Sequence, residues 1–448
     1  MKTILLIDDE ELCRAPAAEL LKRANWNVFE AENGERGVEL ALQERPDVIL
    51  CDLLMPRMNG YHVCRAIREH PELERTKIIV ISGRDFPADR QSAAEAGADD
   101  FLVKPIEFQK LEAVLEKLHP HAPGRETPSE PPREDAPPST PAPMPHDEDV
   151  RVKFWGVRGS IPTPGPTTVY FGGNTSCIEV RADGEIIILD AGSGIRPLGN
   201  ALAQEFAGRR VDTTLLISHT HWDHIQGFPF FVPAYDAKNR VRILGFEGAC
   251  DSLAATLAGQ MESPYFPIAL KQMPGNIVIE ELRDMDFQVG AVKVKACYSN
   301  HPGVSVGYRL ETSGGSIVYL PDNESFSTNS KPAEHRDALP GTLEDRLADF
   351  VKDADVLIID AQYTREEYDK HIGWGHGCVD DVVEFAVKAC VKRLYLFHHD
   401  PGHDDRFLSG MLVHARELAQ RADSSVRVHA AREGEEFTLA LSEVKGAS

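Results

Sequence analysis

The chain has no long apolar run, no paired cysteines and no basic segment, although it is 448 residues long. A membrane-spanning helix needs about 20 apolar residues, and no stretch of this sequence approaches that composition. The first apolar run, residues 3–7, leads directly into four acidic residues, which excludes a signal peptide. The eight cysteines include no C-x-x-C pair, a pattern typical of reduced thiols. We therefore expect a cytoplasmic protein with no membrane partner.

Basic charge is also scarce. The chain carries 48 Lys and Arg against 71 Asp and Glu, and its formal net charge is -23. Acidic residues are in excess in each of the segments 1–119, 120–147 and 148–448. Because proteins that hold long nucleic acids need clustered Lys and Arg to displace counterions, long RNA or DNA is a weak candidate partner.

The composition changes between Pro120 and His146, where proline is abundant and large apolar residues are rare. Such a stretch cannot bury a core and favours extended polyproline II structure, which acts as a spacer. A chain of this length also exceeds one compact domain. We predict a first domain over residues 1–119, a linker over 120–149 and a second domain over 150–448.

In the first domain, short apolar runs alternate with amphipathic segments, which predicts an α/β fold with a doubly wound parallel sheet. The predicted strands are Thr3–Ile7, Asn25–Glu30, Asp47–Cys51, Ile78–Ser82 and Phe101–Val103. The predicted helices include Gly34–Glu44, Gly60–His70 and Pro87–Ala96. Pro16 is expected to kink the first helix or to delay its start.

Polar side chains stand at the ends of four of these strands. They are Asp8, Asp9, Asp52, Ser82 and Lys104. The ends of parallel strands share one edge, and carboxylates gathered there are costly without a cation. Mg²⁺ would suit Asp9, Asp52 and the backbone carbonyl of Leu54. A phosphoryl group on Asp52 would then be balanced by Mg²⁺, the Lys104 ammonium and the Ser82 hydroxyl.

Residues 52–60 read DLLMPRMNG, and this run strongly resembles two-component receiver domains, with a likeness that covers residues 2–119. The resemblance implies a flavodoxin-like domain in which a sensor histidine kinase phosphorylates Asp52. It also implies that Asp8 and Asp9 hold Mg²⁺ and that Ser82 and Phe101 switch conformation.

The second domain is rich in strand-like runs with intervening helical patterns, which predicts a mixed α/β fold. The predicted strands are Val150–Trp155, Glu185–Leu189, Thr213–Ser218, Val241–Phe246, Ala291–Tyr298, Ser305–Thr312, Ser316–Leu320, Val356–Asp360, Arg393–Phe397 and Phe437–Leu441. The predicted helices are Ile195–Ala207, Leu343–Val351 and Val379–Ala389. Ligands in such folds gather at strand ends.

One strand end carries a dense group of metal ligands. Thr213–Ser218 is followed by His219, His221, Asp223 and His224 within six residues. Alternation would place the first three on one side, and a turn would direct His224 elsewhere, so the motif offers two ligands to each of two metals. Imidazole and carboxylate favour Zn²⁺, Fe or Mn.

Further candidates follow later strands: His301, Asp322 and either His398 or His399, of which we favour His398. Asp190 is expected to orient a ligand imidazole. The whole set strongly resembles the metallo-β-lactamase-fold hydrolases over residues 150–443, which implies an αββα sandwich. The resemblance implies one metal on His219, His221 and His301 and another on Asp223, His224 and His398, with Asp322 bridging them. Zn²⁺ is the expected metal, with Mn or Fe as alternatives, and Asp223 would help to orient a bridging water.

His376, in the run Gly375-His376-Gly377, precedes a predicted helix. It resembles the histidine that ribonuclease Z-like phosphodiesterases place beside the scissile phosphate, where it could protonate the leaving oxygen; the alternative is a helix cap. Arg158 could contact a phosphate or be an ordinary surface residue. Phe228, Phe230 and Phe231 could stack a base or simply pack a lid or the core.

These features predict a response regulator with a phosphodiesterase output domain, controlled by phosphorylation of Asp52. The substrate would be a nucleotide or another small phosphodiester, and the long linker leaves room for control through a homodimer. One alternative is hydrolysis of lactones or thioesters on the same metals. Another is a non-hydrolytic metal sensor, although the di-iron oxygen-binding members of this fold generally carry Glu where this chain has His221.

Overall fold

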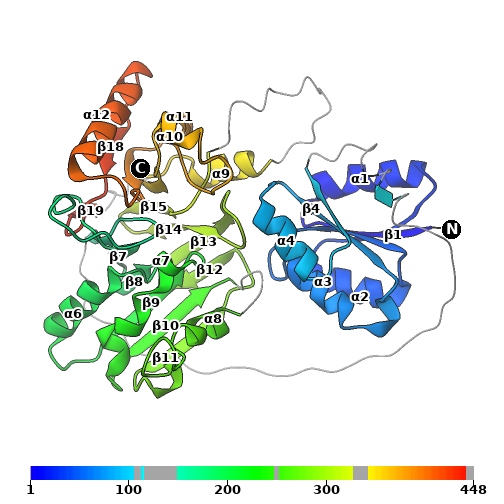
Figure 1. Ribbon diagram of the computed structural model, residues 1–448, viewed down its shortest axis with the longest axis horizontal. Coiled ribbons are helices and arrows are strands. Elements are labelled where there is room, and N and C mark those ends of the chain that lie inside the picture. The colour runs from blue at the N-terminus through cyan, green and yellow to red at the C-terminus, as the bar shows by residue number, and fades with distance from the viewer. Residues whose placement is uncertain are drawn as a thin grey trace, which may run out of the picture. The chain divides into compact units, whose positions relative to one another are not determined.

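A computed structural model describes residues 2–104, 111, 114, 115, 149–246, 252–325 and 342–439. These residues form two compact units, and Figure 1 labels their helices and strands. The predicted linker lies outside the described residues except for position 149, so the domain boundaries remain predictions. Within the described residues, no helix combines the length and apolar character needed to cross a bilayer.

The first unit contains a five-stranded parallel sheet in the order β2-β1-β3-β4-β5. This order is the flavodoxin-like doubly wound one, which confirms the predicted fold class. The strands are β1 (Thr3–Ile7), β2 (Asn27–Ala31), β3 (Val48–Asp52), β4 (Lys77–Ser82) and β5 (Asp100–Val103). The helices are α1 (Glu11–Arg23), α2 (Gly34–Glu44), α3 (Gly60–Arg68) and α4 (Pro87–Glu95). Helix α1 begins early and continues through Pro16.

The second unit consists of two mixed seven-stranded sheets. The first sheet contains, in order, β11 (Asn276–Glu281), β10 (Arg240–Gly245), β9 (Asp212–Ile217), β8 (Glu185–Leu189), β7 (Cys177–Ala182), β6 (Val150–Gly156) and β19 (Glu436–Leu439). The second contains β12 (Asp286–Val289), β13 (Val292–Tyr298), β14 (Val306–Thr312), β15 (Gly315–Leu320), β16 (Val356–Asp360), β17 (Arg393–Phe397) and β18 (Arg427–Ala430). Strands β7, β11, β12 and β18 were not among the predicted ones.

The two sheets face each other. The ring of Phe154 on β6 lies 5.1 Å from that of Tyr395 on β17, centroid to centroid. Tyr308 on β14 donates its hydroxyl to the carbonyl of Ile217 on β9 at 2.6 Å.

Helices cover the outer faces of both sheets (Figure 1). Helices α6 (Ile195–Phe206) and α8 (Leu253–Gly259) share a core with β9 and β10. Helices α9 (Leu343–Val351), α11 (Val379–Lys388) and α12 (Asp405–Arg421) contact strands of the second sheet. This is the expected αββα sandwich.

The topology brings several strand ends to one edge of the sandwich. In the first sheet β8 and β9 are parallel, and in the second β15, β16 and β17 are parallel. Asp190, His219, Asp322 and His398 stand immediately or two residues beyond the carboxyl ends of β8, β9, β15 and β17. The candidate residues therefore approach the same place from both sheets.

The inter-sheet core depends on Phe154, which is fully buried among the rings of Tyr395, Phe397 and Phe437. Phe154→Ala is expected to lower the free energy of unfolding of the second unit by about 3–5 kcal/mol, since it leaves a cavity between the sheets. Hydrogen exchange of β17 peptides should accelerate, while β3 peptides of the first unit should not change. Tyr265→Ala, at a side chain that is 74% exposed, is the control. Unchanged β17 protection would contradict the inter-sheet role.

Candidate metal centre

Two groups of possible metal-binding side chains lie side by side at the strand ends. The first comprises His219, His221, His301 and Asp322, and the second comprises Asp223, His224 and His398. The ligand atoms within each group lie within 4.8 Å of one another. All seven side chains except His221 are buried. The structure thus brings together every residue that the resemblance implied as a ligand.

The carboxylate of Asp322 faces both groups, one oxygen to each. Its Oδ2 lies 3.6 Å from Nε2 of His219 and 3.7 Å from Nε2 of His301. Its Oδ1 lies 3.0 Å from Nε2 of His224 and 3.3 Å from Nε2 of His398. Asp322 is 1% exposed, so its charge is shared between the two groups and not with solvent.

Four of the imidazoles form a hydrogen bond through Nδ1, the ring nitrogen that faces away from the centre. Nδ1 of His224 lies 2.7 Å from Asp190 Oδ2, and Nδ1 of His219 lies 3.1 Å from the hydroxyl of Ser218, which itself donates to Asp190. Nδ1 of His301 lies 2.8 Å from the carbonyl of Gly375.

Nδ1 of His398 lies 3.1 Å from Oε1 of Gln362. Acceptors at all four Nδ1 atoms favour a proton on the outer side of each ring, which leaves Nε2 facing the centre. That is the tautomer a divalent metal requires.

Asp190 is the hub of this outer network. Its carboxylate accepts from the Ser218 amide at 2.7 Å and from the Tyr319 hydroxyl at 2.8 Å, besides its contact with His224. The side chain is fully buried. The structure therefore places Asp190 behind the centre, where the sequence predicted an orienting residue.

The carboxylates of Asp190, Asp223 and Asp322 bring three negative charges into the centre, and positive charge must compensate them. Burial alone would raise the pKa of Asp322, yet the imidazoles of His398 and His224 hold it well below its usual range. Burial alone would lower the pKa of His224, but Asp223 and Asp322 raise it well above its usual range. Among the described residues, no Lys or Arg forms an ion pair with Asp190, Asp223 or Asp322.

The remaining imidazoles favour the neutral form. Burial lowers the pKa of His219 and His301 well below the usual value, and it also lowers that of His221. Neutral imidazole is the form that binds a metal.

Several buried atoms of the centre lack hydrogen-bond partners. Nε2 of His219, Nε2 of His224 and Oδ1 of Asp322 have none, although the last two atoms lie only 3.0 Å apart. Close approach without hydrogen-bond geometry is what atoms aimed at a common ion would show. The donor set of nitrogen and carboxylate oxygen fits Zn²⁺, Mn²⁺ or Fe.

Two residues of the centre have an uncommon backbone conformation. Asp190 has φ of 60° and His398 has φ of 57°, in the left-handed region that L-residues other than Asn, Asp and His rarely adopt. For His398 the turn directs the ring into the centre, with Nε2 3.0 Å from Asp223 Oδ2. Its neighbour His399 instead contacts the carbonyl of Ala431 at 2.9 Å, away from the centre. Of the two candidates, the structure therefore places His398 among the ligand atoms.

His376 lies at the edge of the centre and is paired with a carboxylate. Its Nδ1 is 2.9 Å from Oδ2 of Asp360 and 3.9 Å from Oδ2 of Asp322. Asp360 is fully buried at the end of β16. No role was predicted for Asp360, although it stands at a strand end, as Asp322 and His398 do. The pair keeps the Nδ1 proton of His376 and leaves Nε2 for another partner.

Other sequence candidates have structural positions. Phe228 and Phe231 are fully buried, so they pack the core, and only Phe230 remains exposed. Arg158 is also fully buried, and it donates to the carbonyls of Gly172, Asp400 and His403. This contradicts a surface position for Arg158. Its Nε and Nη1 donate to backbone carbonyls, and its Nη2 is buried without a hydrogen-bond partner.

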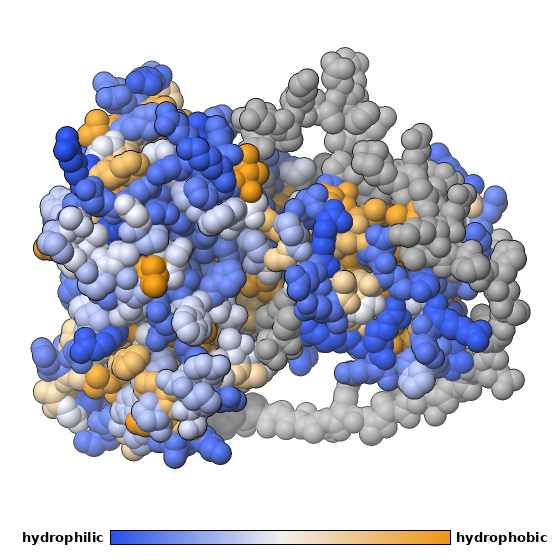
Figure 2. All heavy atoms as spheres, viewed as in Figure 1, coloured by the Kyte–Doolittle hydropathy of each residue, from blue (hydrophilic) through white to orange (hydrophobic). Residues whose placement is uncertain are grey.

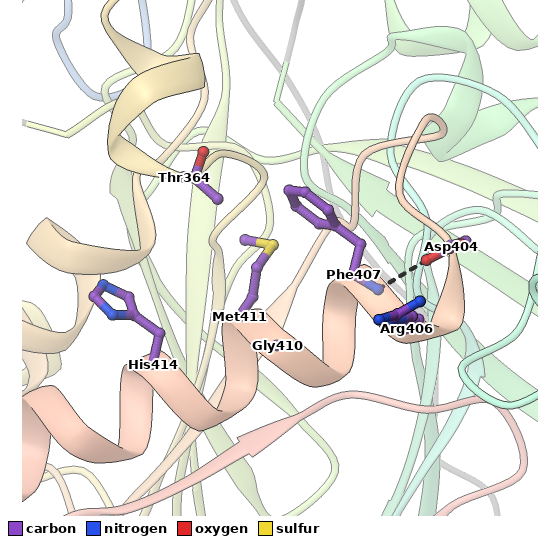
Figure 3. A pocket seen from close by; sticks show the side chains of 7 residues that line it. All are labelled: Thr364, Asp404, Arg406, Phe407, Gly410, Met411 and His414. Atoms are coloured by element: carbon purple, nitrogen blue, oxygen red, sulfur yellow. Dashed lines mark hydrogen bonds between the residues drawn. The ribbon is translucent and has the colours of Figure 1, made fainter.

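A cavity of about 520 Å³ lies elsewhere, along α12. Figure 3 shows Phe407, Met411 and His414 on this helix, with Thr364 on a neighbouring segment. None of its lining residues belongs to either group of ligand atoms. The candidate ligand atoms of the second unit therefore lie outside this cavity.

The first unit gathers its own acidic group. Ligand atoms of Asp8, Asp9 and Asp52 lie within 4.8 Å of one another. The ammonium of Lys104 bridges Asp8 Oδ2 at 2.9 Å and Asp52 Oδ1 at 2.8 Å. Burial, followed by the charge of Asp52, raises the pKa of Asp8. The backbone amide of Leu54 donates to Asp52 Oδ2 at 3.2 Å, so its peptide lies beside the carboxylate.

The residues expected to switch conformation lie on β4 and β5. Ser82 is fully buried at the end of β4, and its hydroxyl accepts from the amide of Arg84 at 3.1 Å. Phe101 is 8% exposed, and the guanidinium of Arg90 lies 4.8 Å from the centre of its ring.

Comparisons with known proteins agree with this division. Residues 4–116 match the profile of the response regulator receiver domain, and residues 186–399 match that of the beta-lactamase superfamily domain. Protein PilH of Pseudomonas aeruginosa is 34% identical over 111 residues, which are 25% of this chain and 92% of PilH. Sensory transduction protein BceR of Halalkalibacterium halodurans is 34% identical over 123 residues, 27% of this chain and 52% of BceR. Unlike PilH, BceR and several other curated relatives are matched over only about half of their length.

Among solved structures, human tRNase Z, short form, is similar over 64% of this chain and 99% of its own, with 21% identity and a TM-score of 0.45. That likeness concerns the fold alone. The chain belongs to the response regulators: its first domain is a receiver, and its second has the metallo-β-lactamase fold.

Gly159 provides a test of the second ligand group. A Cβ at this position would lie 2.4 Å from Cε1 and Nδ1 of the buried His398 ring. Gly159→Ala is therefore expected to displace His398 and to reduce retained zinc from about two equivalents per chain to about one. Zinc is measured by elemental analysis after loading and dialysis.

Gly165→Ala is the matched control in the same loop, because its Cβ would meet nothing closer than Thr168 Oγ1 at 4.0 Å. If both variants retain as much zinc as the wild type, His398 does not hold a metal.

Proposed function

We propose that this response regulator is a dinuclear metal-dependent phosphodiesterase that acts on a nucleotide or another small phosphodiester. The observation that carries the proposal is the carboxylate of Asp322, whose two oxygens face two separate groups of imidazoles. The pair of His376 and Asp360 beside it supplies a proton donor at the edge of the same centre.

The first metal would be held by His219, His221 and His301, the second by Asp223, His224 and His398, and Asp322 would bridge them. Two divalent cations would supply Lewis-acid chemistry, lowering the pKa of a bound water and neutralising phosphate charge. Zn²⁺ is the metal we expect, with Mn²⁺ or Fe as alternatives.

Asp223 orients the attacking water in this proposal. Its Oδ2 accepts from the amide of Ser160 at 2.8 Å and lies 3.2 Å from Nε2 of His224. The carboxylate is thus held by backbone on one side and faces the centre on the other. Ser160 itself has φ of 61°, so its amide is directed by a tight local turn.

His376 donates a proton to the leaving oxygen. The contact of its Nδ1 with Asp360 orients the ring. A leaving alkoxide needs such a donor much more than a stabilised phenolate does. This difference separates a proton donor from a metal ligand.

The receiver is proposed to control this activity through phosphorylation of Asp52 by a sensor histidine kinase. Mg²⁺ would bind at Asp8, Asp9 and Asp52, where Lys104 already compensates part of the charge. Ser82 and Phe101 would transmit the change, with a homodimer as one means of control. Hydrolysis of lactones or thioesters remains an alternative activity. A non-hydrolytic metal sensor is a third reading, disfavoured by His221.

The proton-donor role is tested with His376→Ala on two diesters. Turnover of a substrate with an alkoxide leaving group should fall by about 10²–10⁴-fold, whereas that of bis(p-nitrophenyl) phosphate should fall far less. Asp360→Asn should act in the same direction with a smaller loss. Zinc content is measured in parallel and should stay at the wild-type level. Equal losses on both substrates, or loss of zinc, would show that His376 is not the proton donor.

Regulation is tested by comparing turnover of the wild-type chain with and without a small phosphodonor, alongside Asp52→Ala. We expect the phosphodonor to change the rate of the wild type only, because Asp52 is the residue that accepts the phosphoryl group. Three equal rates would exclude control through Asp52. A panel of acyl esters assayed with the same preparations distinguishes the alternative hydrolase activity.

A further inference from the structure

Two exposed tryptophans stand on segments that flank the centre. The side chain of Trp222 is 70% exposed and that of Trp374 is 60% exposed. Trp222 lies between His221 and Asp223 in the chain, and Trp374 precedes Gly375 and His376. Large apolar side chains with this exposure need an explanation when they lie together at a site.

One imidazole connects the two segments. Nε2 of His301 lies 3.1 Å from Nδ1 of His221, the residue before Trp222. Nδ1 of the same ring lies 2.8 Å from the carbonyl of Gly375, the residue after Trp374. The ring of His301 and the side chain of His221 therefore link the segment that carries Trp222 to the segment that carries Trp374.

The backbone of Trp374 is fixed although its side chain is exposed. The carboxylate of Glu324 accepts from the amides of Gly373 and Gly375, on both sides of Trp374, at 2.7 Å each. The amide of Trp374 itself donates to the carbonyl of His371 at 3.1 Å. The ring of His371 lies 4.7 Å from the indole in an edge-on arrangement. An indole held in this way loses little conformational entropy when it binds a ligand.

The surroundings favour a flat, uncharged group over an additional phosphate. Among the described residues, no Lys or Arg pairs with the carboxylates of the centre. Arg158 is fully buried and donates to backbone carbonyls through Nε and Nη1, while its Nη2 has no hydrogen-bond partner. On the face that Figure 2 shows, hydrophobic residues form small separate groups in a largely hydrophilic surface. Phe228 and Phe231 are buried, whereas both indoles are exposed, so a ligand can reach the indoles.

We propose that Trp222 and Trp374 form a subsite that stacks on a nucleobase or similar planar ring of the substrate. The proposal rests on the proposed function and narrows its substrate class to phosphodiesters with a planar aromatic group. Stacking on aromatic side chains accepts any base, because every base has a π-face. The subsite therefore selects nucleotides as a class.

Calorimetry on the metal-loaded full chain tests the subsite without requiring turnover. The probes are AMP, ribose 5-phosphate and inorganic phosphate, which differ in the base and the sugar. Wild type is expected to bind AMP about tenfold more tightly than ribose 5-phosphate. Trp222→Ala and Trp374→Ala should each reduce this ratio while leaving the affinity for ribose 5-phosphate unchanged. The Trp→Phe variants should retain most of the preference, and Val413→Ala on α12, which is 55% exposed, should behave as wild type.

Equal affinity of the wild type for AMP and ribose 5-phosphate would overturn the proposal. So would a loss that affects all three probes equally, or a change of oligomeric state in the Trp→Ala variants without a change in the ratio. If the preference for AMP is present and no phosphodiester is hydrolysed, the subsite stands and the proposed function fails. If bis(p-nitrophenyl) phosphate is hydrolysed and the ratio is one, the subsite fails and the proposed function stands.

Discussion

The buried negative charge of the Asp322 carboxylate is the constraint on which the second domain depends. It lies between two groups of imidazoles, is almost fully buried and is compensated by no described Lys or Arg. Isolated charges are costly to bury unless they are paired or coordinate a metal. The remaining features follow from this constraint. Acceptors behind the imidazoles fix their tautomers, and both sheets contribute parallel strands whose ends meet there.

The two domains meet the same electrostatic problem with different means. In the receiver, acidic side chains also converge at the ends of parallel strands, but Lys104 lies among them and contributes a permanent positive charge. In the second domain the neutralising groups are imidazoles, which can yield their protons to an incoming cation. The first arrangement suits a cation and a phosphoryl group that come and go, whereas the second suits cations that stay bound.

Much of the fold and of the centre could be predicted because strand ends are visible in sequence. Each apolar run that ended in Asp, His or Ser marked a residue that the structure brings to a shared edge, as with Asp52, Asp190 and His398. Strands such as β7 and β12 were missed because their apolar periodicity is short or interrupted by charge. Phe228 and Phe231 were ambiguous because local sequence does not distinguish a buried aromatic ring from an exposed one.

The contacts that depend on loops were the least predictable. Glu324 accepts from amides about fifty positions further along the chain, and no local pattern reveals such a partner. Arg158 was a candidate phosphate contact or surface residue, yet its partners include backbone carbonyls of Asp400 and His403, far along the chain. Asp360 differs from these residues, because it stands at the end of a predicted strand and could have been identified from sequence.

The left-handed backbone at Asp190 and His398 limits how this centre can diversify. Only glycine and a few short polar or imidazole side chains adopt this conformation readily, and glycine offers no ligand atom. Replacement by a β-branched residue would strain the backbone at the end of β8 or of β17. Backbone sterics therefore restrict which residues can occupy these two positions, whatever the metal requires.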